Sequence, residues 1–282
     1  MTNIHVENGR AVIELYLPAL SDEDGDCYMV YMWDAEENPA FHCMHRVYDD
    51  EPCIIELFHP RLWSGADNPY MYRTDIYGET GRLIFSLDIP IRNVTIVSEN
   101  SIELNGTPFV LKGIYYDIYD TPFAAQWDKL QKVLGFVVRM GANALVCDRL
   151  SDIPEEDLCR LQRHCDRIGL LILDGVHPDC PSLKSLFLSN GVPSPAYYMR
   201  KALWGKEPFV YINAKSFQKQ ADGLYRINVY SNQNKVALFV NGKIFGFQGD
   251  GPEYIFQDIT IRSLPVSFAA EAGGCYMSVT CG

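Results

Sequence analysis

Hydrophobic and polar positions alternate along the first part of the chain. Four short runs rich in aromatic and branched side chains carry this period of two, and turn-prone stretches separate them: Val12–Leu17, Tyr28–Trp33, Ile54–Leu57 and Leu83–Leu87. Such alternation predicts strands that bury one face. Roughly seven short strands in about 100 residues are typical of an immunoglobulin-like β-sandwich, and we expect one over residues 1–98.

The hydrophobic period lengthens in the middle of the chain. Asn105-Gly106 predicts a hairpin turn, after which apolar strands alternate with two helices that end near Gly141 and Gly169. The expected strands cover residues 109–115, 144–147 and 170–174. Strands that are apolar throughout and separated by helices indicate parallel pairing with right-handed crossovers.

The last part of the chain returns to strand character. Prolines break the stretch from His177 to Pro195, and Ala196–Trp204 fits one short amphipathic helix. From Phe209 onward alternation resumes, with a second Asn-Gly turn at Asn241-Gly242. The expected fold class is therefore multidomain β and α/β. It comprises an immunoglobulin-like β-sandwich (1–98), a middle part with about three parallel strands (99–205) and a C-terminal immunoglobulin-like β-sandwich (206–282).

Charge narrows the range of partners. The 282 residues carry a formal net charge of -12. Such a chain offers no basic surface to displace counterions from nucleic acid or an anionic membrane, so we expect neither as a partner. The N-terminus shows no basic-then-apolar signal pattern, and no apolar run reaches the length of a spanning helix.

The cysteines give little sign of a metal site or of disulfides. There are nine, an odd number, without any Cys-x-x-Cys spacing. We expect reduced thiols in a cytoplasmic protein, and no metal or other cofactor.

A series of motifs follows in a set order along the chain: Leu62-Trp63-Ser64, Asn68–Tyr72, Ile91-Arg92, Ile102–Gly113, Met140–Ala144, Cys165–Asp174, Gly191–Trp204 and Tyr230–Lys243. Together they resemble family 2 glycoside hydrolases, the group of β-galactosidases and β-glucuronidases. The resemblance implies an immunoglobulin-like domain, the first three strands of a (β/α)8 barrel, the barrel's exit and a following sandwich.

The departures from that family concern its catalytic part. A closed (β/α)8 barrel takes about 250 residues and at least about 200, whereas only about 105 lie between Asn100 and Trp204. The resemblance passes from the third strand directly to the exit. It thus omits the middle of the barrel, which in the family carries the acid/base Glu and the nucleophilic Glu. The middle part is therefore interpreted as a truncated barrel remnant that lacks both.

The mouth of the remnant is also altered. Ile114–Asp117 stand where the family usually has an Asn-Arg-His type of run, Val146 stands at its Arg position, and Asp174-Gly175 replaces its usual Asp-Glu. Positions that contact sugar in the family are therefore changed.

Three aspartates remain as candidates for a residual site. Asp117, Asp148 and Asp174 each follow a predicted parallel strand, so they are expected at the edge where barrel enzymes work. Tyr115 and Tyr116 are candidates for an aromatic sugar platform beside them, although core packing is the competing interpretation. An open sheet gives no enclosed pocket, so capping or solvated aspartates are favoured over a catalytic pair.

Other chemical groups are better explained by structure. Glu155 and Glu156 complement a helix N-terminus. His164 and His177 have no acid or cysteine at nucleophile spacing. Cys159 and Cys165 lie six apart on one helix and do not share a face.

Three functions remain open. The leading one is a non-catalytic binding or assembly protein, whose exposed sheet edges are covered by the sandwiches or by another copy of the chain. The second is carbohydrate binding without turnover through Tyr115, Tyr116, Asp117, Asp148 and Asp174. The third is a β-glycosidase that uses improvised carboxylates or is completed by a partner chain.

Overall fold

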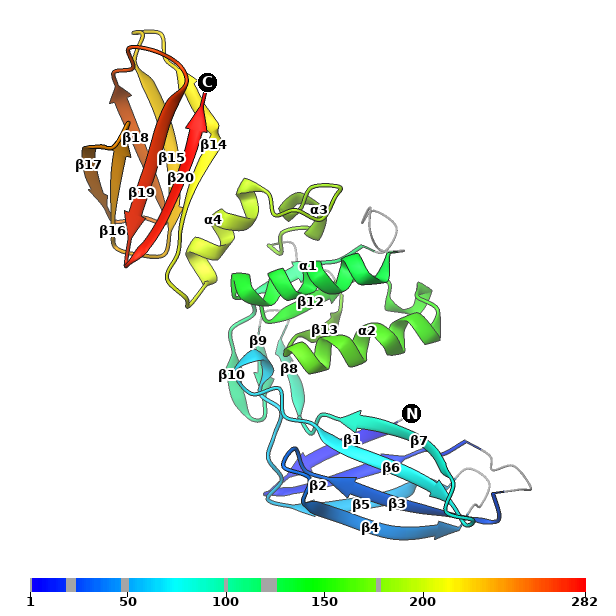
Figure 1. Cartoon of the computed structure of the whole chain (residues 1–282). Helices are drawn as coiled ribbons and strands as arrows, with labels where there is room; N and C mark the ends of the chain where they lie inside the picture. The colour runs from blue at the N-terminus through cyan, green and yellow to red at the C-terminus, as the bar shows by residue number, and fades with distance from the viewer. Residues whose placement is uncertain (1, 19–23, 47–50, 99–100, 118–125, 176–178) are drawn as a thin grey trace. The chain divides into compact units, whose positions relative to one another are not determined.

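A computed structural model describes all residues except 1, 19–23, 47–50, 99–100, 118–125 and 176–178. The protein is mostly β-sheet with few helices, as the sequence predicts (Figure 1). It divides into two compact units. The first comprises residues 1–111 and 154–171, and the second comprises residues 112–153 and 172–282. The predicted boundaries after residues 98 and 205 stay predictions. In the part that the structure describes, no helix is long and apolar enough to cross a membrane.

The first unit contains two antiparallel sheets that lie face to face (Figure 1). One has the order β1-β2-β5, with β1 (Thr2–Glu7), β2 (Arg10–Leu15) and β5 (Cys53–Phe58). The other has the order β4-β3-β6-β7, with β3 (Cys27–Trp33), β4 (Pro39–Arg46), β6 (Tyr72–Gly78) and β7 (Leu83–Ile89). Their inward positions form one core, in which Ile13, Val30, Ile55 and Ile76 are fully buried. Alternation in the sequence thus gives each strand one apolar face for this core.

A three-stranded antiparallel sheet follows in the first unit. It has the order β10-β9-β8, with β8 (Val94–Ser98), β9 (Ser101–Leu104) and β10 (Thr107–Phe109). Asn105 and Gly106 join β9 to β10 with φ values of 55° and 73°, which confirms the predicted turn.

Helix α2 (Glu155–Ile168) belongs to the first unit, as does the short helix η1 (Gly65–Asp67). The indole Nε1 of Trp63 donates to the carbonyl of Asp166 at 2.8 Å, which ties α2 to the chain beside η1. Gly169 ends α2 in the left-handed conformation, as predicted.

The second unit holds the parallel part. Its sheet has the order β11-β12-β13, with β11 (Gly113–Tyr115), β12 (Ala144–Cys147) and β13 (Leu171–Asp174). β11 and β12 are parallel, and every residue of β12 is buried. The predicted continuous strand over residues 109–115 is wrong. The chain leaves strand geometry after Phe109 and resumes it at Gly113, where the Lys112 N–H donates to the Asn143 side chain instead of to a strand.

The described part of the second unit also contains three α-helices and one short 3-10 helix: α1 (Trp127–Met140), η2 (Leu150–Asp152), α3 (Leu183–Leu186) and α4 (Pro195–Trp204). Gly141 ends α1 with φ 97°, and an added Cβ would lie 2.3 Å from the Trp204 carbonyl. Only glycine therefore allows this close approach of α1 and α4.

The C-terminal β region of the second unit also has two antiparallel sheets around one core. The first has the order β14-β15-β18, with β14 (Val210–Lys219), β15 (Tyr225–Ser231) and β18 (Glu253–Ile259). The second has the order β17-β16-β19-β20, with β16 (Lys235–Val240), β17 (Lys243–Gly249), β19 (Val266–Ala272) and β20 (Cys275–Cys281). The predicted turn at Asn241-Gly242 joins β16 to β17. Tyr198 of α4 stacks on Tyr211 of β14 with ring centroids 3.6 Å apart.

Candidate functional site

The predicted aspartates lie at or just beyond the ends of β11, β12 and β13 in the second unit. Asp117 and Asp148 share Arg149: its Nη2 lies 3.4 Å from Asp117 Oδ2, and its Nε lies 3.7 Å from Asp148 Oδ1. Asp174 is exposed at the end of β13. Burial, followed by the charges of Asp148, Asp174 and Asp117, raises the pKa of the Cys147 thiol to about 12. All three carboxylates therefore lie within electrostatic reach of the end of β12.

Tyr115 belongs to the same cluster. Its pKa is raised first by burial, then by the hydrogen bond of its hydroxyl to Asp148 and by the charges of Asp148 and Asp117, while Arg149 lowers it. The backbone N–H of Tyr115 donates to the Pro181 carbonyl at 3.0 Å, and a parallel bridge links Tyr115 to Ser182. The outer edge of β11 is therefore partly paired.

Tyr116 points into the protein instead. It is only 3 % exposed, and its backbone N–H donates to the Val146 carbonyl. Its ring accordingly offers little surface on which a sugar could stack.

The space at the strand ends is small. Among the described residues, Tyr116, Asp117, Cys147, Asp148, Arg149 and Ile153 line a cavity of about 10 Å³. That volume suffices for about one water molecule. A monosaccharide therefore does not fit in it, and Arg149 lies within ion-pair distance of both carboxylates that line it.

The remaining candidates have structural surroundings. Glu155 and Glu156 lie in the first turn of α2, Cys159 is exposed and Cys165 is buried. His177 lies outside the described residues. Among the residues that the structure describes, no group of three His, Cys, Asp or Glu side chains could hold a metal ion.

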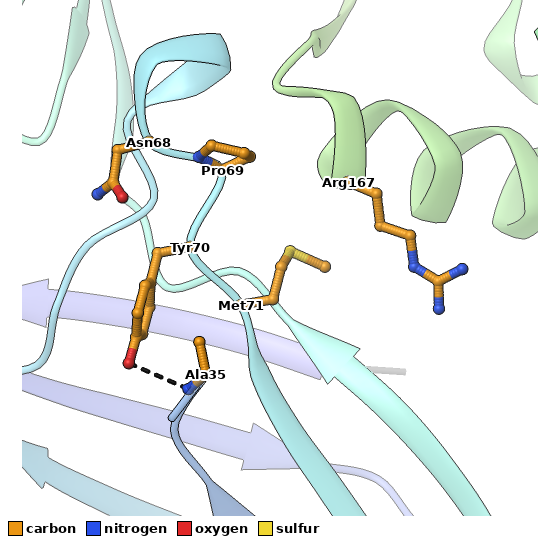
Figure 2. A pocket seen from close by; sticks show the side chains of 6 residues that line it. All are labelled: Ala35, Asn68, Pro69, Tyr70, Met71 and Arg167. Atoms are coloured by element: carbon orange, nitrogen blue, oxygen red, sulfur yellow. Dashed lines mark hydrogen bonds between the residues drawn. The ribbon is translucent and has the colours of Figure 1, made fainter. Parts of the chain in front are cut away.

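A larger and wide-open depression lies in the first unit (Figure 2). It has a volume of about 400 Å³ and is lined by Ala35, Asn68, Pro69, Tyr70, Met71 and Arg167. The Tyr70 hydroxyl donates to Glu36 at 2.9 Å and accepts the Ala35 N–H at 3.1 Å. None of the six lining residues is a carboxylate, so the depression provides no acid–base pair.

An aromatic surface on the first unit was not singled out from the sequence. The Tyr31 ring is near-parallel to those of Trp33 and His42, with centroids 6.3 Å apart and planes 17° apart in each pair. Tyr77 meets Tyr31 edge-on at 5.8 Å. The signal was available, because Tyr31 and Trp33 are two residues apart in a predicted strand, and the same face must therefore carry both.

Comparison with known proteins supports the predicted resemblance. No protein-family model matches the chain. A provisionally named β-glucuronidase of Formosa agariphila is 42 % identical over 66 residues, which make up 22 % of this chain and 8 % of that protein. The match therefore spans a small part of its relative.

Solved structures share the fold over nearly the whole chain. The structure of a Parabacteroides merdae β-glucuronidase aligns with 99 % of this chain, and the alignment covers 63 % of the β-glucuronidase chain. The TM-score is 0.72 and the sequence identity is 10 %. A Bacteroides vulgatus β-glycosidase aligns with 100 % of this chain over 64 % of its own length, with a TM-score of 0.71 and 11 % sequence identity. A glycosyl hydrolase family 2 member from Bacteroides cellulosilyticus aligns with 99 % of this chain over 62 % of its own length, with a TM-score of 0.58 and 15 % sequence identity.

The chain thus spans less than two thirds of the length of these three structures, and at such identities the likeness concerns the fold. The resemblance to family 2 glycoside hydrolases predicted from the sequence motifs is confirmed in fold along the whole chain, and in sequence over a 66-residue segment.

Proposed function

We propose that this protein is a non-catalytic relative of family 2 glycoside hydrolases that acts as a binding or assembly protein. The observation that carries the proposal is that two of the aspartates at the strand ends contact an arginine and, in the described part of the chain, line no space large enough for a sugar. Asp117 and Asp148 are both engaged by Arg149 beside a cavity of about 10 Å³. Glycosidases instead place two carboxyls about 5–10 Å apart across a space that holds the sugar.

The proposal includes a finer interpretation of the fold. The β regions at the two ends of the chain are immunoglobulin-like sandwiches, and the sheet β11-β12-β13 is the remnant of a truncated barrel. The domains run over residues 1–98, 99–205 and 206–282. We place the protein in the cytoplasm, in line with its free cysteines.

Hydrolysis assays test the loss of catalysis. We expect no release of nitrophenol from nitrophenyl β-glucuronide or β-galactoside above the uncatalysed rate. Turnover that disappears in both Asp148→Asn and Asp174→Asn, but persists in Asp152→Asn, would overturn the proposal. It would show that the strand-end carboxylates form a working pair.

The outer edge of β13 is the proposed assembly surface. In the described part of the chain no strand pairs with this edge. The Gly175 N–H donates to the Cys147 carbonyl at 2.9 Å. Because alternate residues of a parallel strand bond to the same neighbour, the N–H groups of Ile172 and Asp174 face away from β12. Outward-facing donors along the edge of an apolar strand favour pairing with a second copy of the chain.

A proline substitution tests this assembly. Ile172→Pro removes an outward-facing donor and leaves the bonds to β12 intact, whereas Leu173→Pro breaks them. Light scattering should show a dimer for the wild type and a monomer for folded Ile172→Pro. A wild type that stays monomeric at all concentrations, with fast amide exchange at residues 172 and 174, would remove the assembly proposal.

Carbohydrate binding without turnover is the second candidate, and the aromatic surface of the first unit favours it. Beside Tyr31 and Trp33, Asp75 accepts hydrogen bonds from Ser86 Oγ at 2.6 Å and Arg73 Nε at 3.2 Å. Half-exposed rings next to polar groups suit a pyranose, which has an apolar face and hydroxyl edges.

Titration calorimetry with β-linked oligosaccharides distinguishes this surface from the strand ends. Trp33→Ala should weaken binding by about tenfold, the equivalent of about 1.4 kcal/mol, if the aromatic surface binds the sugar. Tyr115→Phe and Asp117→Asn should weaken it if the strand ends do. Phe245→Ala, an exposed aromatic on β17, is the control. No heat with any sugar would eliminate this candidate.

A further inference from the structure

Two cysteine sulfurs meet in the core of the first unit. Cys43 lies on β4 and Cys53 on β5, in different sheets, and their Sγ atoms are 3.6 Å apart. Cys53 is 1 % exposed, and Cys43 is partly exposed. The two thiols therefore face each other across the space between the sheets.

The strand registers explain why they meet. Cys43 pairs with Val30 of β3, and Cys53 pairs with Leu15 of β2. Val30 and Leu15 are both buried in the core. The inward face of each strand therefore carries a sulfur, and packing of the sheets brings the sulfurs into contact.

We infer that Cys43 and Cys53 form a dithiol–disulfide pair that closes in the presence of a small-molecule disulfide and links the two sheets of the first unit. A disulfide has an S–S length of about 2.05 Å, so the two sulfurs have to approach by roughly 1.5 Å, a distance that small side-chain rotations cover. This inference does not depend on the proposed function.

The environments of the two thiols set the order of the reaction. The two thiols share a hydrogen bond, which lowers the pKa of Cys43. That hydrogen bond, together with burial, raises the pKa of Cys53. Cys43 is also the more exposed of the two. Because the thiolate is the nucleophile, Cys43 reacts first.

The exchange with oxidised glutathione then balances in two steps. The Cys43 thiolate attacks one sulfur of oxidised glutathione, its S–S bond breaks, and one glutathione leaves as thiolate. Cys53 next gives its proton to water and attacks Cys43 Sγ, which releases the second glutathione. Two protein thiols are oxidised, and one glutathione disulfide is reduced to two thiols.

Thiol counting and peptide mapping test the pair on the full-length chain. After incubation with oxidised glutathione and an acid quench, the denatured wild type should have lost the two thiols of the pair, in addition to any exposed thiol, such as Cys159, that forms a glutathione adduct. Non-reducing digestion should yield the Cys43–Cys53 cross-linked peptide. Cys159→Ser is the control: it removes the exposed thiol on α2 and should still yield the Cys43–Cys53 cross-linked peptide.

Single variants test the reaction order. Cys53→Ser should stop at a glutathione adduct on Cys43. In Cys43→Ser, glutathione should add to Cys53 at least about tenfold more slowly than it adds to Cys43 in Cys53→Ser. Circular dichroism checks that both variants fold. The inference is overturned if folded wild type keeps all nine thiols, if the cross-link joins other cysteines, or if Cys53 reacts equally fast in Cys43→Ser.

Discussion

Arg92 and Asp166 form a buried ion pair between residues 74 positions apart in sequence, with Arg92 Nη1 donating to Asp166 Oδ1 at 2.6 Å. Their side chains are 15 % and 7 % exposed. The Arg92 guanidinium also lies 4.4 Å from the centre of the Trp63 ring, and the Trp63 indole donates to the Asp166 carbonyl. Three side chains thus hold the C-terminal half of α2 within the first unit.

Removing one partner of this pair should be costly. Arg92→Met leaves the Asp166 carboxylate buried without its counter-ion, and we expect a loss of about 3–5 kcal/mol in the free energy of unfolding. The double variant Arg92→Met/Asp166→Leu removes both charges and should lose less than Arg92→Met alone. Urea unfolding of both variants measures the difference. A double variant that loses as much stability as Arg92→Met, or more, would contradict the coupling of the pair.

The same pair predicts a pH dependence with a definite sign. Burial raises the pKa of Asp166, and the charge and hydrogen bond of Arg92 only partly oppose this rise. The folded protein therefore binds this proton more tightly than the unfolded chain does. The resulting stability is present below the unfolded pKa, about 3.9, and is lost as the pH rises through the folded pKa.

A neutral variant isolates this contribution. Asp166→Asn cannot titrate, so the stability of the wild type relative to Asp166→Asn should fall as the pH rises above the ordinary aspartate pKa of about 3.9. Urea unfolding at a series of pH values gives this difference. A relative stability that rises with pH would mean that Arg92 outweighs burial.

Gly169 and Gly106 provide a matched pair of glycine positions in the first unit. Both have positive φ, 81° and 73°. A Cβ on Gly169 would lie 2.2 Å from Ala66 Cα, whereas a Cβ on Gly106 would have no atom within 4 Å. Gly106→Ala should cost about 1–2 kcal/mol from backbone strain alone. Gly169→Ala should cost about 1–3 kcal/mol more, because the backbone at Ala66 has to move.

Thermal unfolding of the two glycine variants tests this comparison. Equal losses would contradict the close approach of Gly169 and Ala66. Gly81 has φ 80°, and an added Cβ there would have no atom within 4 Å. Gly81→Ala should therefore lose about as much stability as Gly106→Ala, from backbone strain alone.

The sequence predicted the elements better than the contacts between them. The hydrophobic period identified β12 and β13. The Asn-Gly pairs at 105–106 and 241–242 identified the turns of the β9–β10 and β16–β17 hairpins. Both signals are local in the sequence. The break between Phe109 and Gly113 was missed, since it depends on a hydrogen bond from Lys112 to Asn143, which lies 31 residues away. The strand that carries Cys43, β4, was not among the predicted runs, and no local pattern identifies Cys53 as the neighbour of Cys43.

The candidate site shows the same division. Three aspartates were expected at one sheet edge because parallel strands end together. The structure places Asp117 and Asp148 just after β11 and β12, and Asp174 at the last position of β13. The sharing of Arg149 and the burial of Tyr116 depend on side-chain packing, which no local pattern encodes.

The hydrogen bond between Tyr115 and Asp148 gives a test of this local geometry. Asp148 raises the Tyr115 pKa through both that bond and its charge. Asp148→Asn should therefore lower the Tyr115 pKa toward its ordinary value of about 10, and Asp174→Asn should leave it unchanged. Nuclear magnetic resonance titration of ring-labelled tyrosine, assigned through Tyr115→Phe, measures both. Equal shifts in the two variants would indicate that the carboxylates act only as distant charges, and that the strand ends do not hold Tyr115 against Asp148.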